Sequence, residues 1–145
     1  MQGWMMTSKP EEALKGMMQE ESTYTPEEMN QAATEIANDP RRRAVLPKLV
    51  EIMYAGALYP HCLDALKVEL QTVKERTPLE DIKAPTLICH GDKDGDVPLA
   101  QAEQANSLIP NSELYIVEGG MHLLILHAKY EEMFKAQVEF AKKHT

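Results

Sequence analysis

The feature that most limits what this chain can fold into is an alternation of strand and helix patterns in its second half. A continuous apolar run from Thr86 to Cys89 predicts a strand, and helical spacing returns over residues 98–109. A second strand pattern, SELYIV, precedes a helical pattern from about Leu124 to Lys143. Two strands joined by a helix run parallel through a right-handed crossover. The sequence therefore predicts a βαβα unit with two neighbouring parallel strands.

Two elements of this unit carry apolar surfaces that need cover. The run from Thr86 to Cys89 shows no polar alternation, which is typical of a strand covered on both faces. The final helical pattern has an apolar stripe that we expect to face the core. That stripe consists of Leu126, Tyr130, Met133, Phe134 and Val138.

Residues 9–76 predict four short helices and no strand. Their start signals are two Ser/Thr-x-x-Glu capping boxes, Ser8 with Glu11 and Thr25 with Glu28. Pro26 takes the first helical position after Thr25, and Asp39 before Pro40 announces another helix. The arginines at 41–43 are interpreted as a solvated helix face.

Composition limits the kinds of partner. The 145 residues are 43% hydrophobic, which suits one compact chain with a core. A net charge of -8 argues against nucleic acid or an anionic membrane as the main partner. The start of the chain lacks the pattern of a signal peptide and no apolar run is long enough to span a bilayer, so we expect a cytoplasmic protein. Cys62 and Cys89 are expected to stay reduced.

The two strands end in loops that carry acid and base side chains. The first strand ends at Gly91 and leads to Asp94, and the second ends at Gly119 and Gly120 and leads to His122. The carboxyl ends of parallel strands meet at one sheet edge, about 4.8 Å apart, where catalytic groups gather. An Asp that accepts the proton of one imidazole nitrogen leaves the other nitrogen free as a base. Asp94 and His122 are thus candidate catalytic residues, two thirds of a hydrolytic triad.

The stretch APTLICHGDKDGDVPLAQAEQANSLIPNSELYIVEGGMHLL resembles the C-terminal segment of the α/β-hydrolase fold. The last two strands of that family typically read PTLxxxGxxDxxVP and then GGxH. The resemblance covers about residues 78–145 and implies that Asp94 is the acid and His122 the base of a Ser-His-Asp triad. Residues 1–77 look like the helical cap that many members place before these strands. The implied parent activity is hydrolysis of an ester, amide or related bond in a small molecule, with no cofactor.

The part of the family fold that this chain resembles does not include the catalytic nucleophile. Family members carry it in a G-x-S-x-G elbow upstream of the cap, and this chain contains no such motif. None of Ser8, Ser22, Ser107 and Ser112 lies between small residues on a strand-to-helix turn. The strands that would supply an oxyanion-hole amide are also missing from the pattern.

Some of these residues also allow other interpretations, a calcium loop, a zinc site or a lid, and the sequence around them argues against each. Asp92, Asp94, Asp96 and Glu103 have EF-hand spacing, but the sixth position is Val97 rather than glycine, and a strand precedes the loop. No recognisable zinc spacing joins the cysteines to His61 or His90, and His90, His127 and His144 are interpreted as structural. No metal is therefore predicted. The methionines at 5, 6, 17, 18, 29 and 53 suit a lid over an apolar substrate, but packing of small helices is preferred.

These patterns together predict an α/β chain, a partial α/β-hydrolase fold with a helical cap segment followed by a βαβα unit. Our first hypothesis is a hydrolase that keeps Asp94 and His122 but lacks its nucleophile and is inactive alone. The second is a non-catalytic protein that uses this half-fold to dimerise or to bind a partner. Both predict exposed apolar surface, and hence a homo-oligomer or association with a missing N-terminal half.

Overall fold

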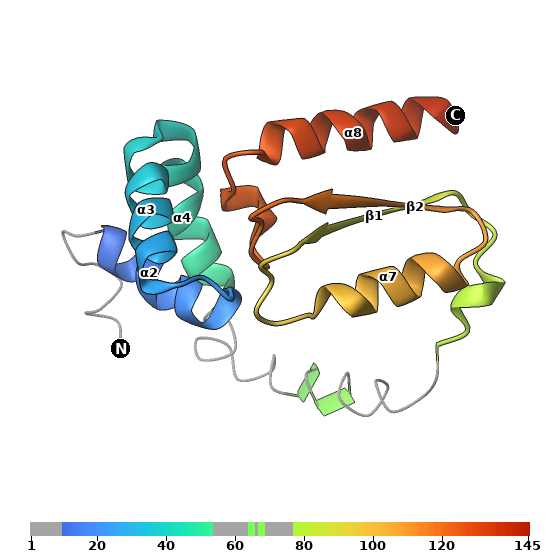
Figure 1. Ribbon diagram of the computed structural model, residues 1–145, viewed down its shortest axis with the longest axis horizontal. Coiled ribbons are helices and arrows are strands. Elements are labelled where there is room, and N and C mark those ends of the chain that lie inside the picture. The colour runs from blue at the N-terminus through green and yellow to red at the C-terminus, as the bar shows by residue number, and fades with distance from the viewer. Residues whose placement is uncertain (1–9, 54–63, 66, 69–76) are drawn as a thin grey trace.

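The computed structural model describes residues 10–53, 64–65, 67–68 and 77–145 and shows an α/β fold (Figure 1). Its first part contains three helices: α2 (Pro10–Glu21), α3 (Pro26–Asn38) and α4 (Pro40–Met53). Its second part contains, in order, the 3-10 turn η1 (Leu79–Asp81), β1 (Thr86–Gly91), α7 (Leu99–Leu108), β2 (Ser112–Val117), the 3-10 turn η2 (Leu124–Leu126) and α8 (Tyr130–Lys143).

The predicted βαβα unit is confirmed. Strands β1 and β2 pair in parallel, with a register that runs from Thr86 opposite Ser112 to Gly91 opposite Val117. Helix α7 lies along one face of this sheet and α8 along the other (Figure 1). The carboxyl ends of both strands point toward the three N-terminal helices, so the loops that follow the strands meet the helical part of the chain.

Local start signals define the N-terminal helices as predicted. The Thr25 side chain accepts from the Glu28 backbone amide, the Glu28 carboxylate accepts from the Thr25 amide, and Pro26 begins α3. The Asp39 carboxylate accepts from the amide of Arg41 at the start of α4. The capping box of Ser8 and most of the fourth predicted helix lie outside the described residues.

The buried core sits where these helices meet the loop after β2. Its members are Leu14, Met18, Ala33, Ile36, Ala37, Met121 and Leu126. Met17 and Met18 are both buried, which supports the packing interpretation for these two methionines. Met29 packs against the core from its edge. The side chains of Met5, Met6 and Met53 lie outside the described part of the chain.

The predicted start of the final helix, at about Leu124, is wrong. The residues from Leu124 to Leu126 form a single 3-10 turn, and α8 begins only at Tyr130. Leu126 turns into the core, 1% exposed, so the chain changes direction before the helix begins. The apolar stripe is also largely uncovered, because Phe134 is 62% exposed and no residue of α8 is buried.

The cover predicted for β1 is only partly present. Every residue from Thr86 to His90 is half-buried, and only Gly91 at the end of the strand is buried. On β2, Ile116 is exposed as well. The two-stranded sheet therefore leaves apolar surface open that its sequence is suited to bury.

The solvated face predicted for the arginines at 41–43 is wrong at Arg42. Arg41 and Arg43 are exposed, whereas Arg42 is 9% exposed and pairs with Asp39 at 2.9 Å. Its guanidinium also donates to the carbonyl oxygens of Glu35 and Leu126. Arg42 thus links the start of α4 to the turn that precedes α8.

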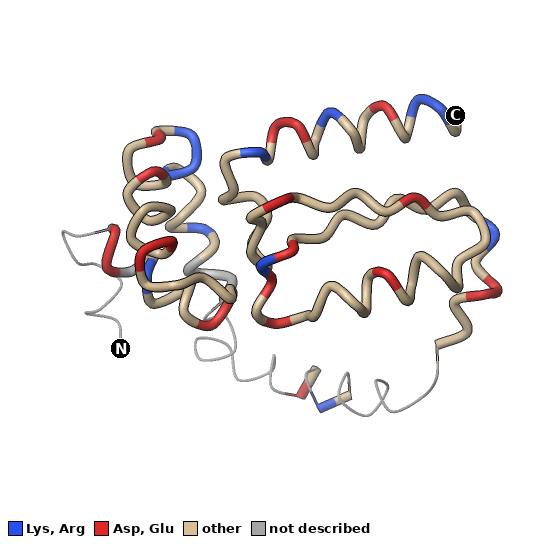
Figure 2. Tube along the Cα trace, viewed as in Figure 1, with Lys and Arg blue, Asp and Glu red and all other residues tan. Residues whose placement is uncertain are grey.

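Acidic positions cluster in the loop between β1 and α7, near the helical part (Figure 2). This loop carries Asp92, Asp94 and Asp96. Cys89 on β1 is a free thiol, and Cys62 lies outside the described residues. Within the described ranges, none of the helices combines the length and the apolar character needed to cross a bilayer.

Candidate active site

The loop after β1 fixes the carboxylate of Asp94. One of its oxygens, Oδ1, accepts from the backbone amides of Asp96 at 2.9 Å and Val97 at 2.8 Å. These bonds close a tight turn within the loop, and the Asp94 side chain is only 6% exposed. The other oxygen, Oδ2, is thereby directed toward the loop that follows β2.

Glycines allow the two loops to approach closely. A side chain at Gly91 would collide with the carbonyl of Gly120, so only a glycine fits there. Gly119 has φ +75°, a conformation that other residues rarely adopt. The Lys93 amide donates to the Gly120 carbonyl at 2.8 Å, which locks the loops together. The GG pair that the sequence places before His122 therefore has a structural reason.

Asp94 and His122 form a hydrogen-bonded pair at the carboxyl edge of the sheet. His122 Nδ1 lies 3.0 Å from Asp94 Oδ2, and because a carboxylate only accepts, the imidazole donates. Its other nitrogen, Nε2, is then free to accept a proton. The His122 side chain is 39% exposed and thus open to solvent on one side. The structure brings the two predicted residues together, and their catalytic role stays a prediction.

Electrostatics favours the charged forms of both members. Burial by itself raises the pKa of Asp94, but hydrogen bonds from Val97, His122 and Asp96 outweigh burial and hold the pKa below its usual value. Burial by itself lowers the pKa of His122, yet the bond and charge of Asp94, helped by nearby acids, raise the pKa above its usual value. The pair is therefore suited to stabilise an imidazolium.

A second imidazole, that of His90, lies near the same carboxylate oxygen. Its Nε2 is 3.6 Å from Asp94 Oδ2, and its Nδ1 donates to the carbonyl of Gly91 at 2.8 Å. The sequence predicts a structural role for His90. Its backbone hydrogen bond agrees with that prediction.

The end of α2 and the residues after it hold this loop cluster from the helical side. The carbonyl of Glu21 accepts from the amides of His122 at 2.9 Å and Gly95 at 3.3 Å. Ser22 forms an isolated bridge with Asp94, and the Thr23 amide donates to the Lys93 carbonyl at 2.9 Å. The positions of Asp94 and His122 thus depend on a segment far away in sequence.

Tyr24 adds a further link between the helical part and the glycine turn. Its hydroxyl donates to the carbonyl of Gly119. Burial, followed by the charges of Glu28 and Asp92, raises the pKa of Tyr24 to about 12. The hydroxyl therefore stays protonated and acts as a hydrogen-bond donor near neutral pH.

Glu21 is a site residue that sequence reasoning missed. The residue is 9% exposed, and its Oε2 has no hydrogen-bond partner among the residues that the structure describes. Burial and the neighbouring Asp96 raise the pKa of Glu21. One carboxylate oxygen each of Glu21 and Asp96 and one ring nitrogen of His122 lie within 4.8 Å of one another. No spacing signal marks Glu21, because only the docking of α2 brings it to the loops.

The described serines do not supply a nucleophile to His122. Their hydroxyls donate to main-chain carbonyls: Ser22 to Met18 at 2.6 Å, Ser107 to Gln104 at 2.7 Å and Ser112 to Ile109 at 2.9 Å. Ser8 lies outside the described residues. Three of the four serines are therefore engaged as structural donors.

The carboxylates with EF-hand spacing have separate partners. Asp92 accepts from the Gly119 amide at 2.6 Å, whereas Asp94 pairs with His122. The loop is entered from the strand β1 and not from a helix, and Glu103 lies exposed on α7. The loop therefore lacks the helical entry that an EF-hand requires.

Comparison with known proteins supports the fold. No protein-family model matches the sequence, and a search of curated proteins found no match. Among solved structures, the chain is similar to an alpha/beta hydrolase fold protein from Nakamurella multipartita, with a TM-score of 0.75 and 24% sequence identity. The match covers 95% of this chain and 48% of that one, so this chain spans about half the length of its structural neighbour. The chain thus adopts part of an α/β-hydrolase fold, as its sequence predicted.

Proposed function

We propose that Asp94 and His122 are the acid and base of a hydrolase site that cleaves an ester, amide or related bond in a small molecule. The observation that carries the proposal is the bond between His122 Nδ1 and Asp94 Oδ2 at the carboxyl edge of a parallel sheet. That edge is where catalytic groups gather in α/β folds. In this role Asp94 orients the ring and stabilises its cation, while Nε2 removes a proton from a nucleophile.

The nucleophile would come from outside this chain. The sequence has no G-x-S-x-G motif, and the described serines bond to main-chain carbonyls. The structural neighbour is about twice as long as the part matched here, which leaves room for a further half of the fold. The proposal therefore includes a completing half, either as a separate partner or within a longer protein.

A first experiment tests the chain as it stands. The purified protein is incubated with a fluorophosphonate probe and with a chromogenic acetate ester, beside its His122→Ala variant. We expect neither a covalent adduct by intact mass nor turnover above that of the variant. A stoichiometric adduct that disappears in the variant would place a nucleophile in this chain and contradict that part of the proposal.

A chimera tests the roles of the pair directly. It joins this chain to the part of the Nakamurella protein that has no counterpart here. We expect ester hydrolysis whose kcat/KM falls at least about 100-fold in His122→Ala and in Asp94→Asn. A surface variant, His144→Ala, is the control and should keep full activity. A folded, active chimera that tolerates His122→Ala would refute the assignment.

Nitrogen NMR of this chain alone gives a second test that needs no chimera. Because Asp94 accepts from Nδ1, neutral His122 should carry its proton on Nδ1 and titrate above the usual histidine value. A neutral ring protonated at Nε2 would contradict the base role.

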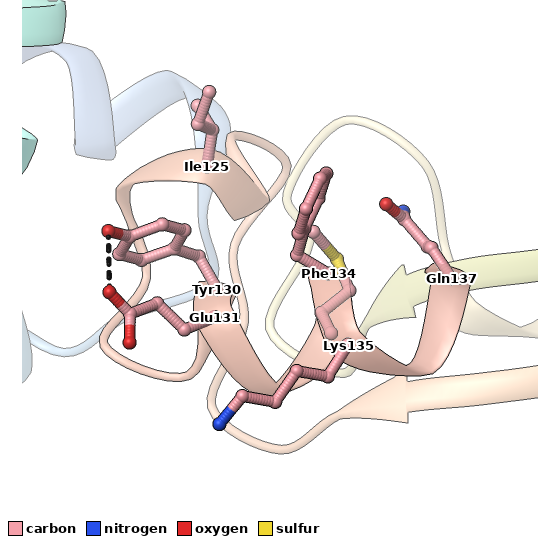
Figure 3. Close-up of a pocket in the computed structure, with 7 residues that line it drawn as sticks. Ile125, Tyr130, Glu131, Phe134, Lys135 and Gln137 are labelled. Carbon is pink, nitrogen blue, oxygen red and sulfur yellow. Dashed lines mark hydrogen bonds between the residues drawn. The ribbon is translucent and has the colours of Figure 1, made fainter. Parts of the chain in front are cut away.

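One observation favours the second candidate function, partner binding without catalysis. A groove of about 570 Å³ on α8 is lined mainly by apolar surface, with Ile125, Tyr130, Met133 and Phe134 among its residues (Figure 3). Ile125 is 47% and Phe134 62% exposed. Exposed apolar patches of this kind mark interaction surfaces. Association through α8 with an unchanged oligomer in His122→Ala and no activity in any chimera would favour this function.

A further inference from the structure

The side chain of Glu21 has a buried oxygen, Oε2, without a hydrogen-bond partner among the described residues. The Glu21 backbone carbonyl accepts from the amides of His122 and Gly95, which fixes the main chain of Glu21 beside the two loops. Buried polar atoms in native proteins nearly always have a hydrogen-bond partner, and leaving one without a partner destabilises the fold. This carboxylate therefore points to a ligand.

Two other side chains face the same space. The ligand atoms of Glu21, Asp96 and His122 lie within 4.8 Å of one another, and His122 Nε2 is 4.0 Å from Asp96 Oδ2. The Nδ1 atom of His122 is already bonded to Asp94, so Nε2 is the nitrogen available to this cluster. Asp96 and His122 are solvent-accessible, with side chains 59% and 39% exposed, which gives an ion a way in.

The distances suit a small divalent cation after a modest shift. Zinc binds imidazole nitrogen and carboxylate oxygen at about 2.0–2.2 Å, so its ligands sit roughly 3–3.5 Å apart. The separation of His122 Nε2 and Asp96 Oδ2 exceeds this by about 0.5–1 Å, which the exposed Asp96 side chain can close by rotation.

The chemistry of the donors selects the class of ion. An imidazole with two carboxylates suits first-row transition cations, whereas calcium and magnesium prefer sites made of oxygen alone. Asp94, behind Nδ1, would act as the outer carboxylate that orients a metal-binding histidine and raises its basicity. Three protein ligands also leave a position for water.

We propose that Glu21, Asp96 and His122 form a binding site for a first-row divalent cation of the zinc type. The site goes beyond the proposed hydrolase function, because binding a cation needs neither a nucleophile nor a completing half. It also uses the same nitrogen, Nε2 of His122, that the hydrolase role needs. A bound cation would therefore block general-base catalysis by His122.

Zinc titration of the metal-free full chain tests the site. Isothermal titration calorimetry should show about one equivalent bound, with the affinity at least tenfold lower in each of Glu21→Gln, Asp96→Asn and His122→Ala. The matched controls, Glu118→Gln and His144→Ala, change an exposed acid and an exposed histidine elsewhere and should bind as the wild type does. Unchanged affinity in Glu21→Gln, or an equal loss in the controls, would overturn the proposal.

Thermal unfolding provides a second measurement that does not depend on the calorimetric signal. Without metal, Glu21→Gln should unfold at or above the wild-type temperature, because it removes an unpartnered buried carboxylate. With saturating zinc, the wild type should gain stability and Glu21→Gln should not. Should Glu21→Gln misfold, Asp96→Asn at the exposed edge of the cluster makes the same comparison. A wild type that gains no stability from zinc would refute the site, and Glu21 would then be a buried neutral acid.

Discussion

The helical part and the βαβα part of this molecule differ in how completely they bury their apolar surfaces. In the helical part, Leu14, Met18 and Ile36 are each 2% exposed or less. In the βαβα part, α8 has no buried residue although it carries an amphipathic stripe. Helices can cover one another's stripes pairwise, whereas a parallel sheet needs cover over its whole width on both faces. Two strands and two helices are too few to meet that need.

The largest expected effect comes from exchanging an apolar side chain for alanine in each part. Ile36→Ala should lower the free energy of unfolding by about 2–5 kcal/mol, because it opens a cavity in the core. Phe134→Ala, on the exposed groove, should change it by about 0.5 kcal/mol or less. Urea denaturation measures both. Equal losses at the two positions would show that α8 is better covered than the structure indicates.

A second prediction concerns the glycines that let the two loops of the βαβα part approach each other. Gly91→Ala should destabilise the protein by about 1–3 kcal/mol, since the new methyl group would collide with the Gly120 backbone. Gly119→Ala meets only His127 at 3.5 Å and should cost about 1 kcal/mol, from its positive φ alone. Thermal unfolding of both variants gives the order. The reverse order would mean that the loops do not approach as closely as described.

A third prediction tests whether the exposed groove on α8 is a contact surface between two copies of the chain. We expect the chain to self-associate through α8, and Phe134→Glu should weaken dimer formation at least tenfold by placing a charge in the apolar contact. Gln101→Glu, on exposed α7, adds the same charge outside the groove and is the control. Sedimentation velocity over a range of concentrations reports the association. A monodisperse wild-type monomer at all concentrations would contradict the prediction.

The smallest effect is the pH dependence at the junction of the two parts. The folded pKa of His122 is raised above 6.5, so its contribution to stability is fully present below pH 6.5 and is lost as pH rises through the folded pKa. The folded pKa of Asp94 lies below 3.8, so its contribution is present above that value and is lost at lower pH. The pair should therefore stabilise most between about pH 4 and 6.5.

The expected size is below about 1 kcal/mol, because His122 is partly exposed and solvent screens the pair. The measurement is the difference in unfolding free energy between the wild type and His122→Ala from pH 4 to 8. The raised pKa of Glu21 also makes stability fall as pH rises, as the raised pKa of His122 does, but from the lower starting value of 4.5. Repeating the comparison in Glu21→Gln isolates the His122 contribution. A difference that grows with pH above 6.5 would contradict the assigned direction.

Much of the fold could be predicted because its signals are local. The capping box of Thr25 and Glu28 marks the start of α3, and the two apolar strands around a helix require a parallel pair. The errors occur where a distant contact decides. Leu124 to Leu126 read as helix, but Leu126 is drawn into the core beside Met18 and the chain bends. Arg42 reads as solvated, but Leu126 and Glu35 offer it carbonyl oxygens and Asp39 a carboxylate.

The candidate site likewise has some features that the sequence predicts and others that depend on distant contacts. The positions of Asp94 and His122 follow from the sequence, because loops at the ends of adjacent parallel strands must meet at one edge. The approach of Glu21, the placement of His90 beside Asp94 and the exposed groove on α8 do not follow from it. They depend on how α2 docks against the loops and on how much surface lies over the sheet. The sequence by itself determined most of the described elements, the parallel pairing and the positions of Asp94 and His122, because backbone propensity and strand connection are local rules. Only the tertiary structure decided which remote side chains reach that pair, because such contacts depend on the packing of whole elements.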